Sequence, residues 1–403
     1  KKVVLIKIHH LSTAFDIAKK ISFQKGKRYT RFIVNLSIAA TAISVAAIIL
    51  TLSVVNGFQE SISDKVYQFW GHIRIATVDG SPIDTAIQFD SDLTQHIESI
   101  TPLKNQSGVI AYQQDIEGVV VKGVPISSNI PFIIQGRAIQ ANKDSNQYEV
   151  ILSAQLANKL KVPLDSSIRL YFLNTDKVEQ RKMKVVGLYN SGIEEYDRQF
   201  IIVDLNTLQK INRNNPGFDA FTVRLKKGVS IDALNDQFQN KIPKSWVATP
   251  IRDYFPQIFD WINVQTVNKN VTIVILLIIA IVNLLTCLFI LMLERVNMIG
   301  TLTSMGATHA FIRQIFLYQA SFICSIGIGI GLIIGIGLSY AQLYLEFIQL
   351  DESAYFMKTL PIQMNWVEIV WVVIGTSFIS YISFLLPTIW IKKIAPAQAI
   401  KFD

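Results

Sequence analysis

The stretch VTIVILLIIAIVNLLTCLFILML, residues 271–293, contains no charged side chain, and the pair Glu294-Arg295 follows it directly. The hydrocarbon core of a bilayer is about 30 Å thick, so an α-helix needs roughly 20 apolar residues to cross it. This run has that length and ends at two charges. It therefore predicts a helix that spans a membrane and meets water at Glu294.

Three further apolar runs occur in the chain, which has 403 residues, a hydrophobic content of 50% and a mean hydropathy of +0.35. A soluble protein of this length is usually more polar. We expect a membrane α-helical bundle of four transmembrane helices with a large extracytoplasmic mixed α/β domain. The expected order is a basic segment (1–31), helix one (32–57), the outer domain (58–267), helix two (268–293), an inner loop (294–313), helix three (314–342), an outer loop (343–364), helix four (365–391) and a tail (392–403).

The distribution of charge predicts which side each segment faces. Nine Lys and Arg residues precede the first apolar run, whereas Asp16 is the one acidic residue there. Basic residues that directly abut a span favour the cytoplasmic side, and this position argues against a nucleic-acid-binding arm. With four spans, the N-terminus, residues 294–313 and the tail, which carries Lys392, Lys393 and Lys401, are expected in the cytoplasm. The outer domain is then extracytoplasmic.

The outer segment alternates between strand-like and helix-like stretches. Helical spacing of apolar residues over Phe58–Gln68 predicts that the first helix continues outward as a stiff stalk. Ser91–Ile100 is predicted to be a short amphipathic helix, and Ser153 is expected to cap a helix over Ser153–Leu160. Other helices are expected at Leu205–Ile211 and Ile231–Phe238, and strands at His72–Thr77, Gly118–Val124, Glu149–Leu152, Ser167–Phe172, Lys182–Gly187, Phe200–Val203 and Phe221–Leu225. The pattern indicates a mixed α/β domain with an antiparallel-rich sheet.

Residues that could carry out chemistry are scattered. His72 and His96 are isolated from other potential metal ligands, which favours solvated or capping histidines. The acidic cluster of Glu194-Glu195 and Asp197 could supply paired carboxylates, but an exposed turn after Ser191-Gly192 explains it more simply. No metal site and no enzyme activity are expected in this chain. The outer domain is expected to bind partners and transmit force.

The inner loop, ERVNMIGTLTSMGATHAFIR, has a pattern of its own. A break is predicted at Gly306, and a second helix is expected to start at Thr308. The first, short helix has an apolar face formed by Met298, Ile299, Leu302 and Met305. Such a helix can dock into a groove on a cytoplasmic partner, or it can rest on lipid headgroups as a plain connector. The residues alone leave both uses open.

The same loop resembles the signature of the FtsX/MacB-type (type VII) ABC transporter permeases. The matching residues are Glu294-Arg295, Ile299-Gly300, Leu302, Gly306-Ala307-Thr308 and Arg313. The end of the chain is similar to the closing motif of this family at Leu386-Pro387, Lys392-Lys393, Ala395-Pro396-Ala397 and Ala399-Ile400. The outer-domain core is similar at Ile151–Leu160, Ser167–Leu170 and Val185-Val186-Gly187. One departure is Leu164-Asp165-Ser166, where a Gly-Asp turn is usual, which puts the geometry of that turn in doubt.

A shorter element, Ser53-Val54-Val55-Asn56-Gly57-Phe58 at the end of the first span, resembles the lipoprotein-releasing (Lol) branch of the family through its Asn-Gly-Phe end. That branch implies extraction of lipoproteins from the outer leaflet of the inner membrane and transfer to a periplasmic carrier. Two alternatives remain: MacB-type efflux, and an FtsX-like signalling permease that activates a cell-wall hydrolase. Signalling permeases usually have a smaller outer domain, so the large outer domain here argues against the signalling alternative. The Asn-Gly-Phe element favours lipoprotein release over efflux.

The resemblance also implies partners. The permease would pair with a second copy or a paralogue and bind two cytoplasmic ABC ATPase subunits, which hold the ATP and Mg; no cofactor is expected in this chain. Consistently, Gly26-Lys27 lacks the surrounding residues of a phosphate-binding loop. The residues implied to couple the permease to the ATPases are Glu294, Arg295, Met298, Ile299, Leu302, Met305, Gly306, Ala307, Thr308 and Arg313.

Residues inside the spans suggest two further roles. The resemblance implies an apolar cavity for lipid between the first and second spans. Its candidate lining residues, for which ordinary packing or lipid contact is the alternative, are Ile43, Ala47, Leu50, Ile278 and Val282. Gly327, Gly331 and Gly335 recur at a spacing of four, which permits close helix packing. A phosphate-binding glycine loop is the alternative, but it would need a strand-turn-helix setting. We therefore expect these glycines to pack within the chain, against the fourth span.

Polar and thiol groups in the spans should also be accommodated by packing. Asn283 and Thr286 are expected to face protein or a cavity, since an amide that faces lipid is costly. Cys287 and Cys324 are expected to be packing residues and not a disulfide pair.

Overall fold

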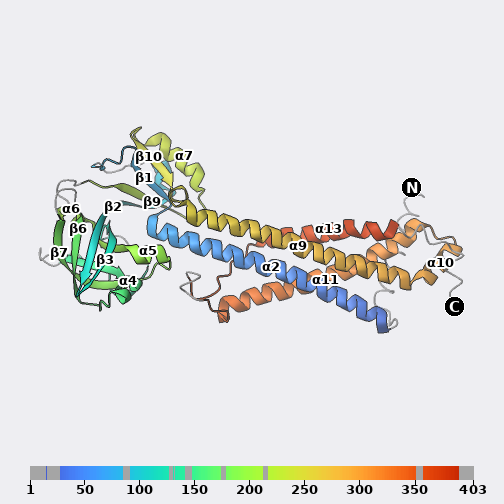
Figure 1. Cartoon of the computed structure of the whole chain (residues 1–403). Helices are drawn as coiled ribbons and strands as arrows, with labels where there is room; N and C mark the ends of the chain where they lie inside the picture. Colours follow the sequence, from blue (N-terminus) through green and yellow to red (C-terminus); the bar gives the residue numbers. More distant parts are fainter. Residues whose placement is uncertain are drawn as a thin grey trace. The chain divides into compact units, whose positions relative to one another are not determined.

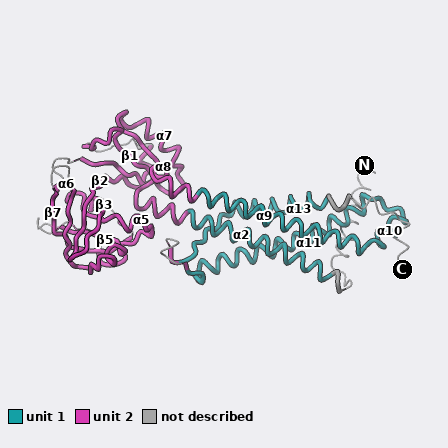
Figure 2. The backbone as a smooth tube through the Cα atoms, in the orientation of Figure 1, with its two compact units in different colours: residues 1–59, 263–349, 359–403 teal, residues 60–262, 350–358 magenta. Residues whose placement is uncertain are grey.

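The computed structural model describes residues 15, 28–84, 91–126, 130, 132–140, 148–173, 178–211, 217–350 and 357–389 (Figure 1). The chain forms two compact units (Figure 2). Unit 1 comprises Lys1–Gln59, Asn263–Gln349 and Thr359–Asp403, and unit 2 comprises Glu60–Ile262 and Leu350–Lys358. The basic residues before Arg28 and the closing motif from Lys392 onward, both used in the sequence analysis, lie outside the described residues.

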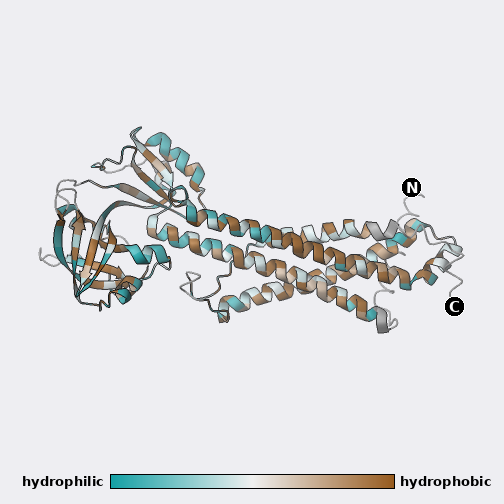
Figure 3. Ribbon diagram, viewed as in Figure 1, coloured by the Kyte–Doolittle hydropathy of each residue, from teal (hydrophilic) through white to brown (hydrophobic). Residues whose placement is uncertain are grey.

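Unit 1 is built from long apolar helices. Four of the described helices are long and apolar enough to cross a membrane, and Figure 3 shows the brown, hydrophobic stretch along them. They are α2 (Arg28–Trp70), α9 (Pro256–Glu294), α11 (His309–Leu345) and α13 (Trp366–Ile389), with the short helix α10 (Val296–Ser304) after α9. The first helix continues past the first span without a break, as predicted, and ends at Trp70.

The glycines of α11 lie against α2, and not against the fourth span as the sequence analysis expected. A Cβ atom built on Gly331 would lie 2.7 Å from the carbonyl oxygen of Ala42, and one on Gly327 would lie 2.8 Å from the Cβ of Thr41. Gly335 is similarly close to Ile49. Helical spacing marks the face of a helix that permits close approach, but it carries no information about which helix fills that face.

Two polar side chains of the second span are bonded inside the chain. The Asn283 amide donates to the carbonyl oxygen of Ser37 in α2, at 3.2 Å, so it faces protein as expected. Thr286 is exposed in the single chain, and its hydroxyl donates to the carbonyl oxygen of Val282 in its own helix, at 2.8 Å; whether it faces a cavity stays a prediction. This local bond lowers the cost of an exposed hydroxyl within a span. Cys287 and Cys324 are both buried free thiols.

Unit 2 is organised around one long strand, β2 (Ile97–Tyr112). Its first half pairs with β9, and its second half pairs with β3 and β6. The strands β2, β3, β8, β5, β7 and β6 follow one another around a closed ring, while β9, β1 and β10 extend as a second sheet from the first half of β2. The other strands are β1 (Ile73–Thr77), β3 (Asp115–Val124), β4 (Ile133–Gly136), β5 (Tyr148–Ser153), β6 (Ser167–Leu173), β7 (Val178–Tyr189), β8 (Phe200–Asp204), β9 (Ala220–Leu225) and β10 (Trp246–Pro250).

Each sheet encloses a separate core that short helices cover. Inside the ring, the alternating side chains of β3, β6 and β7 pack with α4 (Ala154–Lys159) and α6 (Leu205–Ile211). Beneath the second sheet, α7 (Ile231–Lys241) contributes Leu234 and Phe238. Ser153 caps α4 as predicted, because its hydroxyl accepts a hydrogen bond from the backbone N–H of Leu156 at 3.0 Å. The remaining helices are α3 (Ser91–Thr94), α5 (Glu194–Gln199) and α8 (Ile251–Tyr254).

The helix predicted over Ser91–Ile100 is wrong in its second half. The helix α3 ends at Thr94, and β2 begins at Ile97. Ile97 is buried and pairs with Leu225 of β9, so a long-range sheet contact outweighs the local helical pattern.

The acidic cluster is not a simple exposed turn either. Glu194 is exposed and pairs with Arg198 at 2.9 Å, but Asp197 is buried. The Asp197 carboxylate accepts hydrogen bonds from the backbone N–H of Ser191, at 3.0 Å, and of Gly192, at 3.3 Å. Burial raises the pKa of Asp197, and the hydrogen bonds from Ser191 oppose that rise. The carboxylate therefore holds a turn, and it is not arranged with a second carboxylate for acid-base chemistry.

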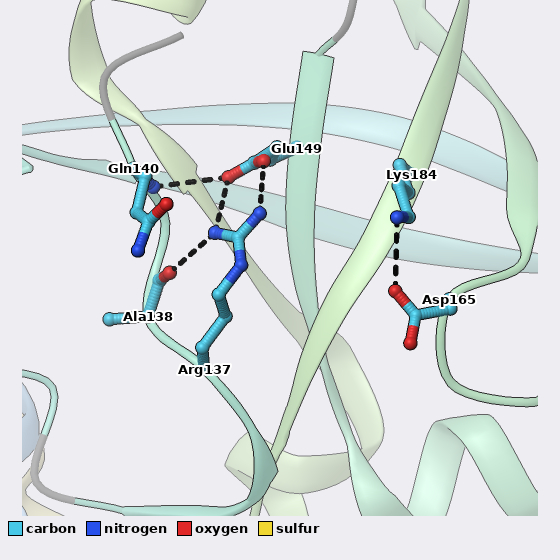
Figure 4. Close-up of polar contacts among 6 residues, drawn as sticks. All are labelled: Arg137, Ala138, Gln140, Glu149, Asp165 and Lys184. Carbon is cyan, nitrogen blue, oxygen red and sulfur yellow. Dashed lines mark hydrogen bonds and ion pairs between the residues drawn. The ribbon is translucent and has the colours of Figure 1, made fainter.

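The turn at Leu164-Asp165-Ser166 keeps a glycine-like geometry without a glycine. Asp165 adopts a left-handed backbone with φ of 63°, a conformation that Asp tolerates better than most residues. Its carboxylate pairs with Lys184 of β7 at 3.0 Å (Figure 4). The same figure shows the Arg137 guanidinium beside Glu149 of β5. It donates a hydrogen bond to each carboxylate oxygen of Glu149, at 2.6 Å and 3.0 Å.

The outer end of α2 is capped by a lysine from the sheet. The last carbonyl groups of a helix have no partner within the helix. Here the buried ammonium of Lys122, in β3, donates to the carbonyl oxygen of Phe69, and it lies 3.7 Å from the centre of the Phe69 ring. Burial lowers the pKa of Lys122 to about 7. A cation at a helix C-terminus is favourable, so this contact fixes α2 to the ring of strands within unit 2.

Replacing Gly331 with Val should disturb the contact between α2 and α11. The new side chain would meet the backbone of Ala42, and such overpacking costs about 1–3 kcal/mol. Gly329 is the matched control, because a Cβ there has nothing within 4 Å. Thermal unfolding of the purified chain in detergent should show a lower Tm for Gly331→Val and little change for Gly329→Val. Equal effects of the two variants would contradict the close contact.

His72 should make the stability of the chain depend on pH. Its ring stacks on Tyr67, and its Nδ1 accepts a hydrogen bond from the backbone N–H of Leu225 at 3.1 Å. Burial, and then the charge of Arg224, lower the pKa of His72 to about 4, although Glu98 opposes this. The unfolded chain has a histidine pKa near 6.5 and binds the proton first. The contribution of His72 to the free energy of unfolding should therefore be fully present above about pH 6.5. It should be lost as the pH falls towards 4.

The measurement is the Tm of the purified chain across this pH range. The His72→Phe variant cannot titrate there, so its Tm should fall less steeply with acidification than that of the unaltered chain. Parallel curves would show that His72 does not bind its proton in this window.

Candidate coupling surface on the inner loop

The inner loop forms a separate short helix because the chain breaks at both of its ends. Arg295, between α9 and α10, has φ of −106° and ψ of 19°, which interrupts the helix after Glu294. The helix α10 then runs from Val296 to Ser304. The short helix and its break at Gly306 are therefore present where the sequence predicts them.

The second break is a Schellman motif. Gly306 has φ of +89°, a left-handed conformation that suits glycine. Its N–H donates to the carbonyl oxygen of Thr303 at 3.0 Å, and the N–H of Ala307 donates to that of Leu302 at 2.9 Å. Thr308 follows at once as the N-cap of α11. The chain thus reverses in a few residues, which holds the orientation of α10 relative to α11.

One face of α10 packs onto the helices of unit 1. Ile299 is 2% exposed and joins the core formed by Ile312 and Phe316 of α11. Met298 and Leu302 are half-buried against the same core. The apolar residues of this face therefore hold α10 in place, and Ile299 has no surface to offer a partner.

The opposite face is exposed and ends in an apolar side chain. Asn297, Thr301 and Ser304 are exposed at helical spacing, and Met305, which is 79% exposed, follows them. The hydroxyls of Thr301 and Ser304 donate to carbonyl oxygens of their own helix, at 2.9 Å and 3.0 Å. Their protons are thereby used within the helix, and the face presents methyl groups and oxygen atoms beside the Met305 thioether. We call this set of residues, Asn297, Thr301, Ser304 and Met305, the outer face of α10.

The ten residues predicted for coupling differ in their exposure. Arg295, Met298, Ile299, Leu302 and Ala307 are buried or half-buried, whereas the exposed ones are Glu294, Met305, Gly306, Thr308 and Arg313. Sequence reasoning did not select Asn297, Thr301 and Ser304. Their spacing of four and three residues places them on one face of a helix and can be seen in the sequence. Polar residues on one helix face usually indicate only contact with water, so the spacing did not point to a binding surface. A role for any of these residues in docking stays a prediction.

The residues proposed to line a lipid cavity are accessible in the single chain. Ile43, Ile278 and Val282 are exposed, and Ala47 and Leu50 are half-buried. An exposed apolar side chain on a span can contact lipid, a second permease chain or bound acyl groups. Their exposure is compatible with a cavity, but their function stays a prediction. Among the described residues, no three His, Cys, Asp or Glu side chains gather closely enough to hold a metal ion.

Comparison with known proteins agrees with this architecture. Residues 35–241 match the MacB-like periplasmic core domain, and residues 270–396 match the FtsX-like permease C-terminal domain. The chain therefore belongs to the FtsX/MacB-type family of ABC transporter permeases. It is an inner-membrane protein with a periplasmic domain whose sheet is barrel-like, and four helices of its described part are apolar and long enough to be spans.

Among characterised relatives, the chain is similar to lipoprotein-releasing permeases. The lipoprotein-releasing system transmembrane protein LolC of Buchnera aphidicola subsp. Schizaphis graminum is 23% identical over 92% of this chain and 94% of that protein. LolE of Haemophilus influenzae is 22% identical over 97% of this chain and 99% of that protein. The match to the crystal structure of the periplasmic region of MacB from Actinobacillus actinomycetemcomitans covers 47% of this chain and 92% of that protein's chain, with 15% identity and a TM-score of 0.32.

The two faces of α10 should respond differently to a new charge. Ile299→Glu places a carboxylate in the core and should destabilise the chain by about 3 kcal/mol or more. Met305→Glu changes an exposed side chain and should alter stability by less than about 0.5 kcal/mol. Thermal unfolding of both variants in detergent measures the difference. A large loss of stability in Met305→Glu would mean that the outer face of α10 is covered by the chain itself.

Proposed function

We propose that the chain is the permease subunit of an ABC transporter that extracts lipoproteins from the outer leaflet of the inner membrane and passes them to a periplasmic carrier. The observation that carries this proposal is the similarity to lipoprotein-releasing permeases over more than nine-tenths of the chain. The Asn56-Gly57-Phe58 element at the end of the first span supports the same branch. Two ATPase subunits would bind ATP and Mg, and a second permease, identical or paralogous, would complete the complex.

The energy of lipid transfer explains why such a machine is needed. Burial stabilises an acyl chain by about 0.8 kcal/mol per CH₂ group, so three chains of about fifteen carbons would cost roughly 36 kcal/mol to expose to water. A lipoprotein therefore cannot cross to its carrier through bulk water. An apolar route has to shield the chains, and Ile43, Ile278 and Val282 are exposed apolar side chains of the first and second spans that could provide it.

Coupling to ATP requires a contact on the cytoplasmic side. In the proposed topology, residues 1–31, 294–313 and 392–403 face the cytoplasm, and residues 58–267 face the periplasm. The outer face of α10 would then dock into a groove of the ATPase. Met305 projects from α10, and the packed inner face with the turn at Gly306 keeps it there. A nucleotide can shift the permease between states only if the ATPase contacts the two states differently, and this surface is suited to making that distinction.

The proposal predicts a defect in lipoprotein sorting. A strain depleted of this chain should retain lipoproteins in the inner membrane, and a plasmid copy of the unaltered gene should restore their transfer. A copy with Met305→Glu should restore it poorly, because the charge faces the ATPase groove, whereas Val78→Glu, an exposed residue of the periplasmic domain, should restore it fully. Fractionation of the two membranes followed by detection of lipoproteins measures the outcome.

Normal sorting in the depleted strain would reject lipoprotein release as the function. Full restoration by Met305→Glu, at equal amounts of protein in the membrane, would instead reject the docking role of α10 and leave lipoprotein release standing.

A further inference from the structure

The Asn56-Gly57-Phe58 element lies where three spans of unit 1 meet. The Asn56 side chain, in α2, donates through Nδ2 to the Oε2 atom of Glu368 in α13, at 2.8 Å. Its Oδ1 atom accepts a hydrogen bond from the ammonium of Lys269 in α9, at 2.9 Å. One amide therefore stands between a cation of the second span and an anion of the fourth span.

The two charges fix the orientation of this amide. An ammonium only donates hydrogen bonds, and an ionised carboxylate only accepts them. If the Asn56 amide were turned over, its NH₂ group would face the ammonium and its carbonyl oxygen would face the carboxylate. Both contacts would then be repulsive, so a single orientation is favoured. Both observed bonds are charge-assisted, and such bonds are roughly twice as strong as neutral ones.

Glu368 is itself held in place by the start of α13. Its second carboxylate oxygen, Oε1, accepts a hydrogen bond from the Asn365 amide at 3.3 Å, and the Oδ1 atom of Asn365 accepts from the backbone N–H of Val367 at 3.1 Å. A carboxylate in the first turn of a helix is also favoured by the helix dipole. Both oxygens of Glu368 are therefore engaged, one by its own helix and one by α2.

The chain before α13 contacts α2 through backbone atoms next to Asn56. A Cβ atom on Gly57 would lie 2.4 Å from the carbonyl oxygen of Pro361, so the approach requires glycine. The backbone N–H of Gln363 donates to the carbonyl oxygen of Ser53 at 2.9 Å. The element thus combines an ordered polar contact at Asn56 with a close backbone contact at Gly57.

We propose that Asn56 is a positioning residue that fastens the first, second and fourth spans into one body at the end that leads to the periplasmic domain. The first span is the helix that continues into that domain. The fastening lets a displacement that begins at the inner loop, between the second and third spans, reach this helix. The inference rests on the proposed function for its transport readout, and the fastening itself can be measured without lipoprotein.

A charge swap provides the test. Asn56→Asp keeps the shape of the side chain, but it places a carboxylate against Glu368 and should break the contact. Adding Glu368→Gln supplies an amide that donates to the new carboxylate, which also still accepts from Lys269. The Asn56→Asp/Glu368→Gln double variant should therefore recover the contact that Asn56→Asp loses. Gln59→Glu is the matched control, because it adds the same charge three residues along α2, where the hydroxyl of Thr266 can reverse and donate to it.

The fastening is measured by a disulfide between Ser53→Cys and Gln363→Cys in the full complex, with Cys287 and Cys324 replaced by Ala. The backbone hydrogen bond between these positions brings their Cα atoms within reach of a disulfide. The yield of crosslink should fall roughly tenfold in Asn56→Asp, because a charge-assisted bond is lost, and should recover in the double variant. Gln59→Glu should retain the yield of the unaltered chain.

Transport is then followed as lipoprotein release from proteoliposomes that contain the whole complex. Release should fall and recover in the same order as the crosslink, while the amount of assembled complex stays equal. Asn56→Asp without effect on the crosslink, or a double variant no better than the single one, would overturn the proposal. If the crosslink follows the expected order but even the unaltered complex releases no lipoprotein, the fastening stands and the proposed function fails.

Discussion

Lipid hydrocarbon offers no hydrogen-bonding partner to a backbone N–H or C=O group, and this constraint shapes every span of the chain. The spans are helices because a helix satisfies its own backbone. Four of their hydroxyl groups are satisfied in the same way: Thr41, Thr286, Ser339 and Ser383 each donate to the carbonyl oxygen four residues earlier. Where helices meet without polar groups, their contact depends on shape, and α11 meets α2 through a stripe of glycines.

Water can reach the surface of the periplasmic domain, so buried polar groups there serve a different purpose. They hold places where regular structure ends. Lys122 closes the last turn of α2, and Asp197 closes the turn at Ser191. Arg137 and Glu149 tie an irregular segment to the edge of β5. Lys122, Asp197 and Glu149 are buried, and removal of its partner would leave each of them unpaired, which is the costly outcome.

The sequence allowed the four spans to be predicted because their length, lack of charge and flanking charges are local properties. The helix expected at Ser91–Ile100 failed in its second half because pairing of Ile97 with Leu225, far along the chain, outweighed the local pattern. The glycine stripe was identified, but its neighbour was not, since periodicity describes one face of a helix and says nothing about the helix opposite.

The inner loop shows the same limit at the candidate site. The short helix, its break at Gly306 and the start at Thr308 follow from residue types and their order. The sequence could not show that Ile299 faces its own bundle, because an amphipathic pattern does not say whether the chain or a partner covers the apolar side. The exposed polar face, with Asn297 and Thr301, became a candidate only when the packing of the other face was known.

One strand is common to both sheets of the periplasmic domain. The first half of β2 belongs with β9, and the second half closes the ring with β3 and β6. A twist applied to either sheet is consequently carried along a single covalent backbone, with no loop between them to absorb it. A shift of β2 by one residue would move its buried side chains to the opposite face of the sheet in both hydrophobic cores at once. The two halves of this domain should therefore unfold together as one cooperative unit.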